Sequence, residues 1–147
     1  MTVPPRAVRV LLVEDDPERE RLLRSWLPPG VRVVVARSAG QALGILERDR
    51  GDVYGAILLD HDLTERTVTE RDRSLSGSDV VGAVVAHVDR TVPVLVHSMN
   101  PREAPGMVER LERAGFDVTR KPMAQLTREW LVHWIGEVAG WAEEDGE

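Results

Sequence analysis

Short, almost continuously apolar runs alternate with amphipathic segments along the whole chain. The apolar runs fall near residues 7–13, 31–36, 54–60, 92–98 and 116–120. They are rich in Val, Ile and Leu, which is typical of β-strands, and the lack of alternation indicates strands that are covered on both faces. The pattern therefore predicts a parallel sheet between two layers of helices.

The segments between the strands carry the start and stop signals of helices. Asp16 followed by Pro17 predicts an N-cap and a first helical position, and Ser38 with Gln41 predicts a capping box for a second helix. The apolar face of the first helix is expected to hold Leu22, Leu23, Trp26 and Leu27. Further helices are expected over about 78–89, 102–114 and 124–143.

Five strand and helix repeats predict a doubly wound α/β domain, and a length of 147 residues fits one such domain over residues 1–147. The segment 64–76 is an exception, because it alternates Glu, Arg and Asp and matches no helix or strand pattern. We expect it to form a flexible surface insertion beside the carboxyl ends of the strands.

Composition and charge exclude several functional classes. A formal net charge of -6 argues against direct DNA binding, which needs clustered Lys and Arg. No apolar run is long enough to span a membrane, and the first residues do not resemble a secretory signal. With no cysteine in the chain, disulfides and thiolate metal sites are ruled out. A cytoplasmic location is expected.

Polar residues follow four of the predicted strands, at the edge of the sheet where open α/β domains bind ligands. They are Glu14, Asp15 and Asp16 after the first strand, Asp60 and Asp62 around the end of the third, His97, Ser98 and Asn100 after the fourth, and Lys121 after the fifth. So many carboxylates in one crevice would repel each other unless a cation intervenes. The oxygen-rich set predicts a Mg²⁺ site formed by Glu14, Asp15, Asp16, Asp60 and Asp62, with Lys121 beside a phosphate.

This arrangement resembles the response-regulator receiver domain over nearly the whole chain. The resemblance implies a flavodoxin-like fold with a five-stranded parallel sheet in the order 2-1-3-4-5. It also implies that Asp60 is the phosphoacceptor, that Asp15 and Asp16 hold magnesium, that Ser98 senses the phosphoryl group and that Lys121 pairs with it. A histidine kinase or a phosphotransfer protein would then be the partner.

Other residues depart from the receiver pattern. Met99 stands where receivers usually have a small residue, and Val118 where an aromatic switch residue is common. The strings DHDL (60–63) and HSMN (97–100) are similar to a receiver offshoot that processes cyclic phosphates, such as the termini left on cleaved RNA. Under this interpretation His61 or His97 transfers protons, with Asn100 nearby.

Two placements remain open on sequence alone. His97 and Ser98 are adjacent, so in a continuing strand their side chains would face opposite sides, and His97 is either part of the site or a buried core histidine. The last predicted helix carries Trp130, Trp134 and Trp141. Core packing explains these rings best, and a homodimer through this C-terminal helix face is the alternative.

The sequence is therefore compatible with three functions. The first is a stand-alone receiver that accepts a phosphoryl group on Asp60 in a two-component phosphorelay. The second is a metal-assisted phosphoesterase that acts on cyclic phosphates and uses His61, His97 and Asn100. The third is a receiver-like interaction module that is not phosphorylated.

Overall fold

The computed structural model describes residues 8–61, 63 and 75–138. Five parallel strands form one sheet in the order β2-β1-β3-β4-β5, as predicted. The elements in chain order are β1 (Val8–Val13), α1 (Pro17–Trp26), β2 (Val31–Ala36), α2 (Ala39–Arg48), β3 (Ala56–Leu59), α4 (Gly77–His87), β4 (Val94–Val96), α5 (Ala104–Arg113), β5 (Val118–Arg120), the 3₁₀ turn η1 (Met123–Gln125) and α6 (Arg128–Val138).

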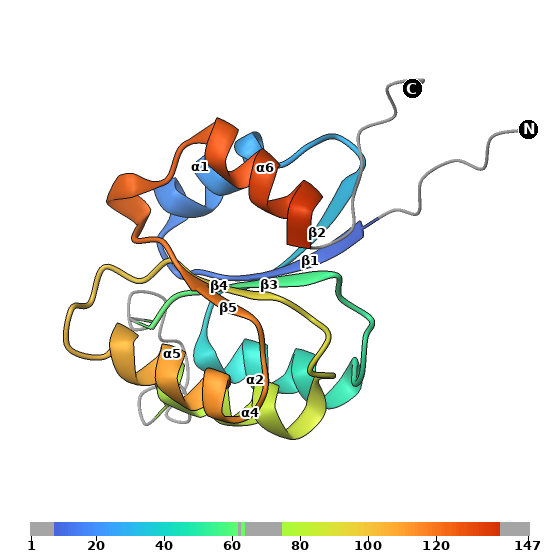
Figure 1. Cartoon of the computed structure of the whole chain (residues 1–147), viewed down its shortest axis with the longest axis vertical. Helices are drawn as coiled ribbons and strands as arrows, with labels where there is room; N and C mark the ends of the chain where they lie inside the picture. Colours follow the sequence, from blue (N-terminus) through green and yellow to red (C-terminus); the bar gives the residue numbers. More distant parts are fainter. Residues whose placement is uncertain (1–7, 62, 64–74, 139–147) are drawn as a thin grey trace, which may run out of the picture.

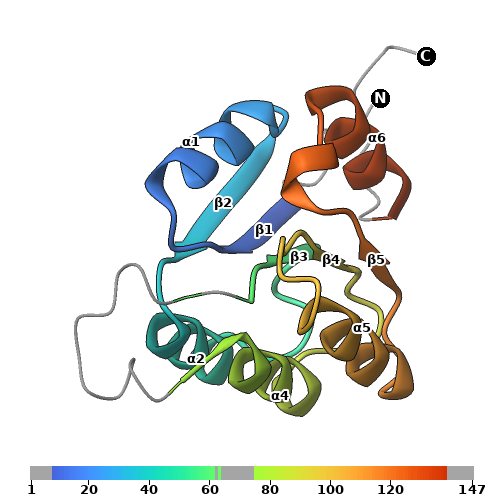
Figure 2. The ribbon, with the colours of Figure 1, turned by 90° about the vertical axis from the view of Figure 1, so that its left-hand side faces the viewer.

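Helices cover both faces of the sheet (Figure 1). Helices α1 and α6 lie on one face, and α2, α4 and α5 lie side by side on the other (Figure 2). Alternate strand residues feed two separate cores: Val13, Leu59 and Val96 belong to the α2/α4/α5 side, and Leu12, Leu58 and Leu95 to the α1/α6 side. The prediction of strands buried on both faces is confirmed.

Most helix ends follow the chemistry predicted for them. The Asp16 carboxylate accepts hydrogen bonds from the backbone N–H groups of Glu18 and Arg19, and Gly115 ends α5 in the left-handed region at φ +100°. The capping box predicted at Ser38 is only half formed. Ser38 accepts from the Gln41 N–H, but the Gln41 side chain bonds the N–H of Arg37 instead of that of Ser38.

Three further expectations need correction or fall outside the described residues. Leu22 is 43% exposed, so it is not part of the buried face of α1. The last helix does not begin at residue 124, because η1 intervenes and α6 starts at Arg128. Residues 64–74 of the predicted insertion are not described, but Leu75 packs against the core and Ser76 caps α4 in a full capping box with Asp79. Among the described residues, no helix is both long and apolar enough to cross a membrane.

Candidate functional site

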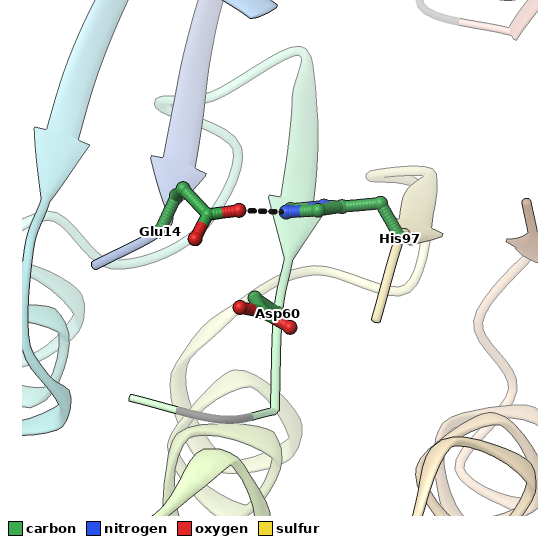
Figure 3. Close-up of side chains that lie close together, drawn as sticks. All are labelled: Glu14, Asp60 and His97. Atoms are coloured by element: carbon green, nitrogen blue, oxygen red, sulfur yellow. Dashed lines mark hydrogen bonds and ion pairs between the residues drawn. The ribbon is translucent and has the colours of Figure 1, made fainter. Parts of the chain in front are cut away.

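The register of the sheet places three polar side chains in one row. The last residues of β1, β3 and β4 are paired neighbours, namely Val13, Leu59 and Val96. The ladder continues one residue further, because Asp60 N–H donates to Val13 O (3.1 Å) and His97 N–H to Leu59 O (3.1 Å). In-register neighbours of a parallel sheet point to the same face. Glu14, Asp60 and His97 therefore lie on the side of α1 and α6, like Leu12, Leu58 and Leu95 two residues before them. Figure 3 shows the three side chains close together.

Glu14 is the hub of this row. Its Oε1 lies 2.9 Å from Nε2 of His97, and its Oε2 accepts from the Asp16 N–H (3.1 Å) and from Nε of Arg19 (3.3 Å). Glu14 is fully buried and His97 is 1% exposed. Burial alone would raise the pKa of Glu14, but the hydrogen bond and charge of His97, with the smaller effects of Asp16 and Arg19, hold that pKa below its usual value. Glu14 thus stays ionised and fixes the imidazole.

Asp60 lies in the middle of the row and behaves in the opposite way. Burial raises the pKa of Asp60 to about 6, and the neighbouring Glu14 charge adds to the rise while His97 and Arg19 oppose it. Its Oδ1 accepts from the His61 N–H (2.8 Å). Its Oδ2 is buried and has no hydrogen-bond partner among the described residues. A carboxyl group with such a pKa can take up or release a proton near neutral pH.

Arg19 is the site residue that the sequence interpretation missed. Its guanidinium lies 3.3 Å from Glu14, 3.6 Å from Asp60 and 3.9 Å from Asp16. The pKa of Arg19 is raised: burial lowers it, and the carboxylates that surround the guanidinium more than offset that effect. The signal was available, because a residue three positions after an N-cap at a strand end lies on the first turn of the helix, beside the ends of the strands.

The cluster of Glu14, Asp60 and His97 has the composition of a metal site. One ligand atom from each lies within 4.8 Å of the others. The buried Oδ2 of Asp60 fits a divalent cation, which would also relieve the repulsion between the two carboxylates. Asp15 is buried and Asp16 caps α1, but neither belongs to this group, and Asp62 lies outside the described residues. The magnesium role of these three aspartates stays a prediction.

Ser98 and Asn100 form the turn that leads from β4 to α5. Ser98 is fully buried, and its Oγ accepts from the Asn100 N–H at 3.0 Å. The Oδ1 of Asn100 accepts from the N–H groups of Arg102 and Glu103. His97 and Ser98 are both buried, because helices cover both faces of the sheet, and His97 is the one that joins Glu14 and Asp60. Asn100 has a clear structural role here, and its catalytic role stays a prediction.

His61 follows Asp60 but lies apart from the metal-binding group. Its ring Nε2 is 3.8 Å from Glu103 Oε1, and its side chain is 13% exposed. The backbone of α4 packs tightly against it, because a Cβ added to Gly77 would lie 2.5 Å from the Cα of His61. Glycine is therefore required at the start of α4. Of the two histidines proposed to transfer protons, the structure brings His97 and not His61 to Glu14 and Asp60.

Lys121 lies at the end of β5, where the receiver pattern predicts it, but it makes a different contact. Its Nζ is 5.5 Å from the centroid of the Trp130 ring, and it forms no ion pair with any carboxylate of the described residues. Trp130 in turn stacks on Trp134, which is 6% exposed. These two rings pack within the α1/α6 side, and Trp141 lies outside the described residues. The homodimer through this face stays a prediction.

Comparison with known proteins extends this description. The family model described as the cyclic-phosphate processing receiver domain matches residues 9–113. A search of curated proteins gives no match. Among solved structures, the receiver domain of a sensor histidine kinase from Pseudomonas aeruginosa, which holds a magnesium ion in its active-site cleft, is 28% identical with a TM-score of 0.59. The alignment covers 92% of this chain and 99% of that one.

Two more distant structures have the same fold. The response regulator domain of CheB from Thermotoga maritima is 18% identical with a TM-score of 0.63, over 94% of this chain and 100% of that one. A signal receiver domain from Pseudomonas fluorescens is 15% identical with a TM-score of 0.66, over 92% of this chain and 96% of that one. Because the family model spans well over half of the sequence, this chain belongs to the cyclic-phosphate processing receiver domain family.

Proposed function

We propose that this protein is a metal-dependent phosphoesterase that opens cyclic phosphates, such as a ribose 2′,3′-cyclic phosphate at an RNA end. The observation that carries the proposal is the buried Glu14–His97 pair in register with Asp60. A phosphoacceptor needs Asp60 and a cation but has no use for a buried imidazole at this place. The match to the cyclic-phosphate processing family supports the same conclusion.

The chemistry follows from these three residues. Glu14 accepts a hydrogen bond from Nε2–H of His97, which leaves Nδ1 as the basic ring nitrogen. Nδ1 is buried without a hydrogen-bond partner among the described residues, a position that substrate or water normally fills. Nδ1 would take the proton of the attacking water, whose oxygen forms the new bond to phosphorus. The P–O bond to the sugar breaks, and the departing oxygen takes up a proton from solvent, to which His97 returns the proton that it accepted.

Glu14 and Asp60 would also hold a divalent cation such as Mg²⁺. Asp15, which follows Glu14 in the sequence, is a further candidate ligand. When bound, the cation supplies positive charge to the phosphate oxygens. The relative that holds magnesium in its active-site cleft supports this assignment.

The test is hydrolysis of adenosine 2′,3′-cyclic phosphate with Mg²⁺ by the wild type and by His97→Gln. Glutamine keeps an N–H for Glu14 but cannot accept the proton, so we expect a loss of about a hundredfold or more in turnover. His133→Gln is the matched control, because His133 is exposed on α6, where it pairs with Glu137. Equal turnover by His97→Gln and wild type would contradict the proposal.

A second function is favoured by Asp60 and Ser98, which occupy the ends of β3 and β4 as in a phosphorylated receiver. In that case a histidine kinase or phosphotransfer protein supplies the phosphoryl group. Intact mass after incubation with a small phosphodonor and Mg²⁺ would show one adduct on the wild type and none on Asp60→Asn. His97→Gln should still carry the adduct. Absence of both turnover and adduct would favour a non-phosphorylated interaction module.

A further inference from the structure

Arg19 lies between the buried row of Glu14, Asp60 and His97 and the surface of the protein. Asp16 caps α1 and holds the N–H of Arg19, which fixes the residue on the first turn of the helix. From there the guanidinium contacts Glu14 and Asp60 while its side chain remains 31% exposed. One face of the cation therefore meets buried carboxylates, and the other is open to solvent.

In the receiver pattern, Lys121 supplies the positive charge beside the aspartate. In this structure, Arg19 and not Lys121 lies beside Asp60. The Lys121 ammonium lies against the Trp130 ring, whereas Arg19 is the cation within 4 Å of Asp60 in the described part of the chain. A guanidinium presents a planar fork of N–H groups that matches two phosphate oxygens at once. Arg19 thus has both the position and the geometry for phosphate.

Arg19 also lines an open cavity of about 580 Å³. The lining residues are Glu18, Arg19, Arg21, Leu22, Ser25 and Met123. This volume is in the range of small-molecule sites. A phosphate held by Arg19 would therefore leave room beside it for the organic group to which it is attached. Exposed Leu22 and half-buried Met123 offer apolar surface for that group.

We propose that Arg19 competes with a divalent cation for Glu14 and Asp60 and becomes the phosphate-binding residue when such a cation is bound. The guanidinium lies 3.3 Å from Glu14 and 3.6 Å from Asp60 and offsets their charge. A bound cation takes over the charge and the lone pairs of those carboxylates, which frees the fork of Arg19 for phosphate. Metal and phosphate would then each strengthen the binding of the other by the same factor. This inference rests on the proposed function, because it assumes a phosphate substrate.

The experiment measures two affinities by calorimetry, that for Mg²⁺ alone and that for inorganic phosphate on the Mg²⁺-loaded protein. We expect Arg19→Gln to bind Mg²⁺ more tightly, because a competing cation is gone, and to bind phosphate about tenfold more weakly, because the fork is gone. Opposite changes in two affinities cannot come from a general loss of structure. Arg19→Lys should restore charge but only part of the phosphate affinity.

Arg113→Gln is the matched control for net charge, because Arg113 is 79% exposed, pairs with Glu109 and lies on α5, which covers the other face of the sheet. Its phosphate affinity should stay within about twofold of the wild type, as expected for an exposed charge. The inference would be overturned if Arg19→Gln left either affinity unchanged, if Arg113→Gln matched its loss, or if Lys121→Gln lost more. None of these readouts requires turnover, so they decide the role of Arg19 even if cyclic phosphates are not hydrolysed.

Discussion

Two aspartates near opposite ends of the strands show how burial and hydrogen bonding shift the pKa of the same type of side chain in opposite directions. Asp49 ends α2 near the amino ends of the strands. Its carboxylate accepts hydrogen bonds from Nε and Nη2 of Arg48, at 3.1 and 3.0 Å, and from the Tyr54 hydroxyl at 2.7 Å. These hydrogen bonds, that of Arg48 first, lower the pKa of Asp49 to about 2. Asp60, at the carboxyl ends, is buried with weaker compensation, and its pKa is about 6.

This difference in pKa shows that the unfavourable buried charge lies at the carboxyl ends of the strands, on Asp60. The Asp49 carboxylate has hydrogen-bond partners from the protein itself, Arg48 and Tyr54, so it does not require a ligand. The row of Glu14, Asp60 and His97 leaves one oxygen of Asp60 and one ring nitrogen without hydrogen bonds in the described part of the chain. Functional sites commonly keep such groups for a ligand at some cost in stability.

Asp60→Asn should give the largest change in stability. At pH 8 the wild type holds an ionised Asp60 whose pKa is raised to about 6, so removing the charge should increase the free energy of unfolding in the absence of metal, by on the order of 2 kcal/mol. Urea unfolding at pH 8 would measure it. An unchanged or lowered free energy of unfolding would show that Asp60 is not a destabilising charge.

Addition of Mg²⁺ should stabilise the wild type and remove this difference. A ligand at a hundred times its dissociation constant adds about 2.7 kcal/mol to the free energy of unfolding. Asp60→Asn should gain much less, whereas Asp49→Asn should gain as much as the wild type, because Asp49 lies at the far edge. Equal stabilisation of all three proteins would place the metal elsewhere.

The pH dependence of stability should have opposite signs at the two aspartates. The folded pKa of Asp60 is above its unfolded value near 3.9, so the folded state binds the extra proton and stability falls as pH rises from about 4 to 6. The folded pKa of Asp49 is below its unfolded value, so its contribution is present above about pH 4 and lost towards pH 2. Subtracting the unfolding curves of Asp60→Asn and Asp49→Asn from that of the wild type isolates each slope. The same sign for both would refute the comparison.

The fold class could be predicted from the sequence because short runs of Val, Ile and Leu between amphipathic segments are typical of strands buried on both faces. The strand order 2-1-3-4-5 was implied by the resemblance to the receiver domain, and the sheet has that order. Boundaries were less certain: the run over 54–60 became a strand of only four residues, because Tyr54 already turns its hydroxyl to Asp49.

The candidate site could be predicted only as a set of residue types. Glu14, Asp60 and His97 were all named, but which of them meet depends on register between strands far apart in the chain. Counting one residue beyond each paired strand end would have selected them over Asp15 and Ser98. Arg19 could have been found from its place three residues after the N-cap Asp16, which puts it on the first turn of α1 beside the strand ends. The ring contact of Lys121 depends on how α6 packs on the sheet, and no local pattern encodes that.

The smallest expected effect concerns Asp49 at neutral pH. Asp49→Asn loses an ion pair with Arg48, whose side chain is 68% exposed, and solvent screens such pairs strongly. The Tyr54 hydroxyl can still donate to the amide oxygen, so the cluster keeps this partly buried hydrogen bond. We therefore expect a loss below about 1 kcal/mol in urea unfolding at pH 7, with exposed Asp52→Asn as the matched control. A much larger loss would mean that pairing at this edge stabilises the fold as strongly as burial at the other edge destabilises it.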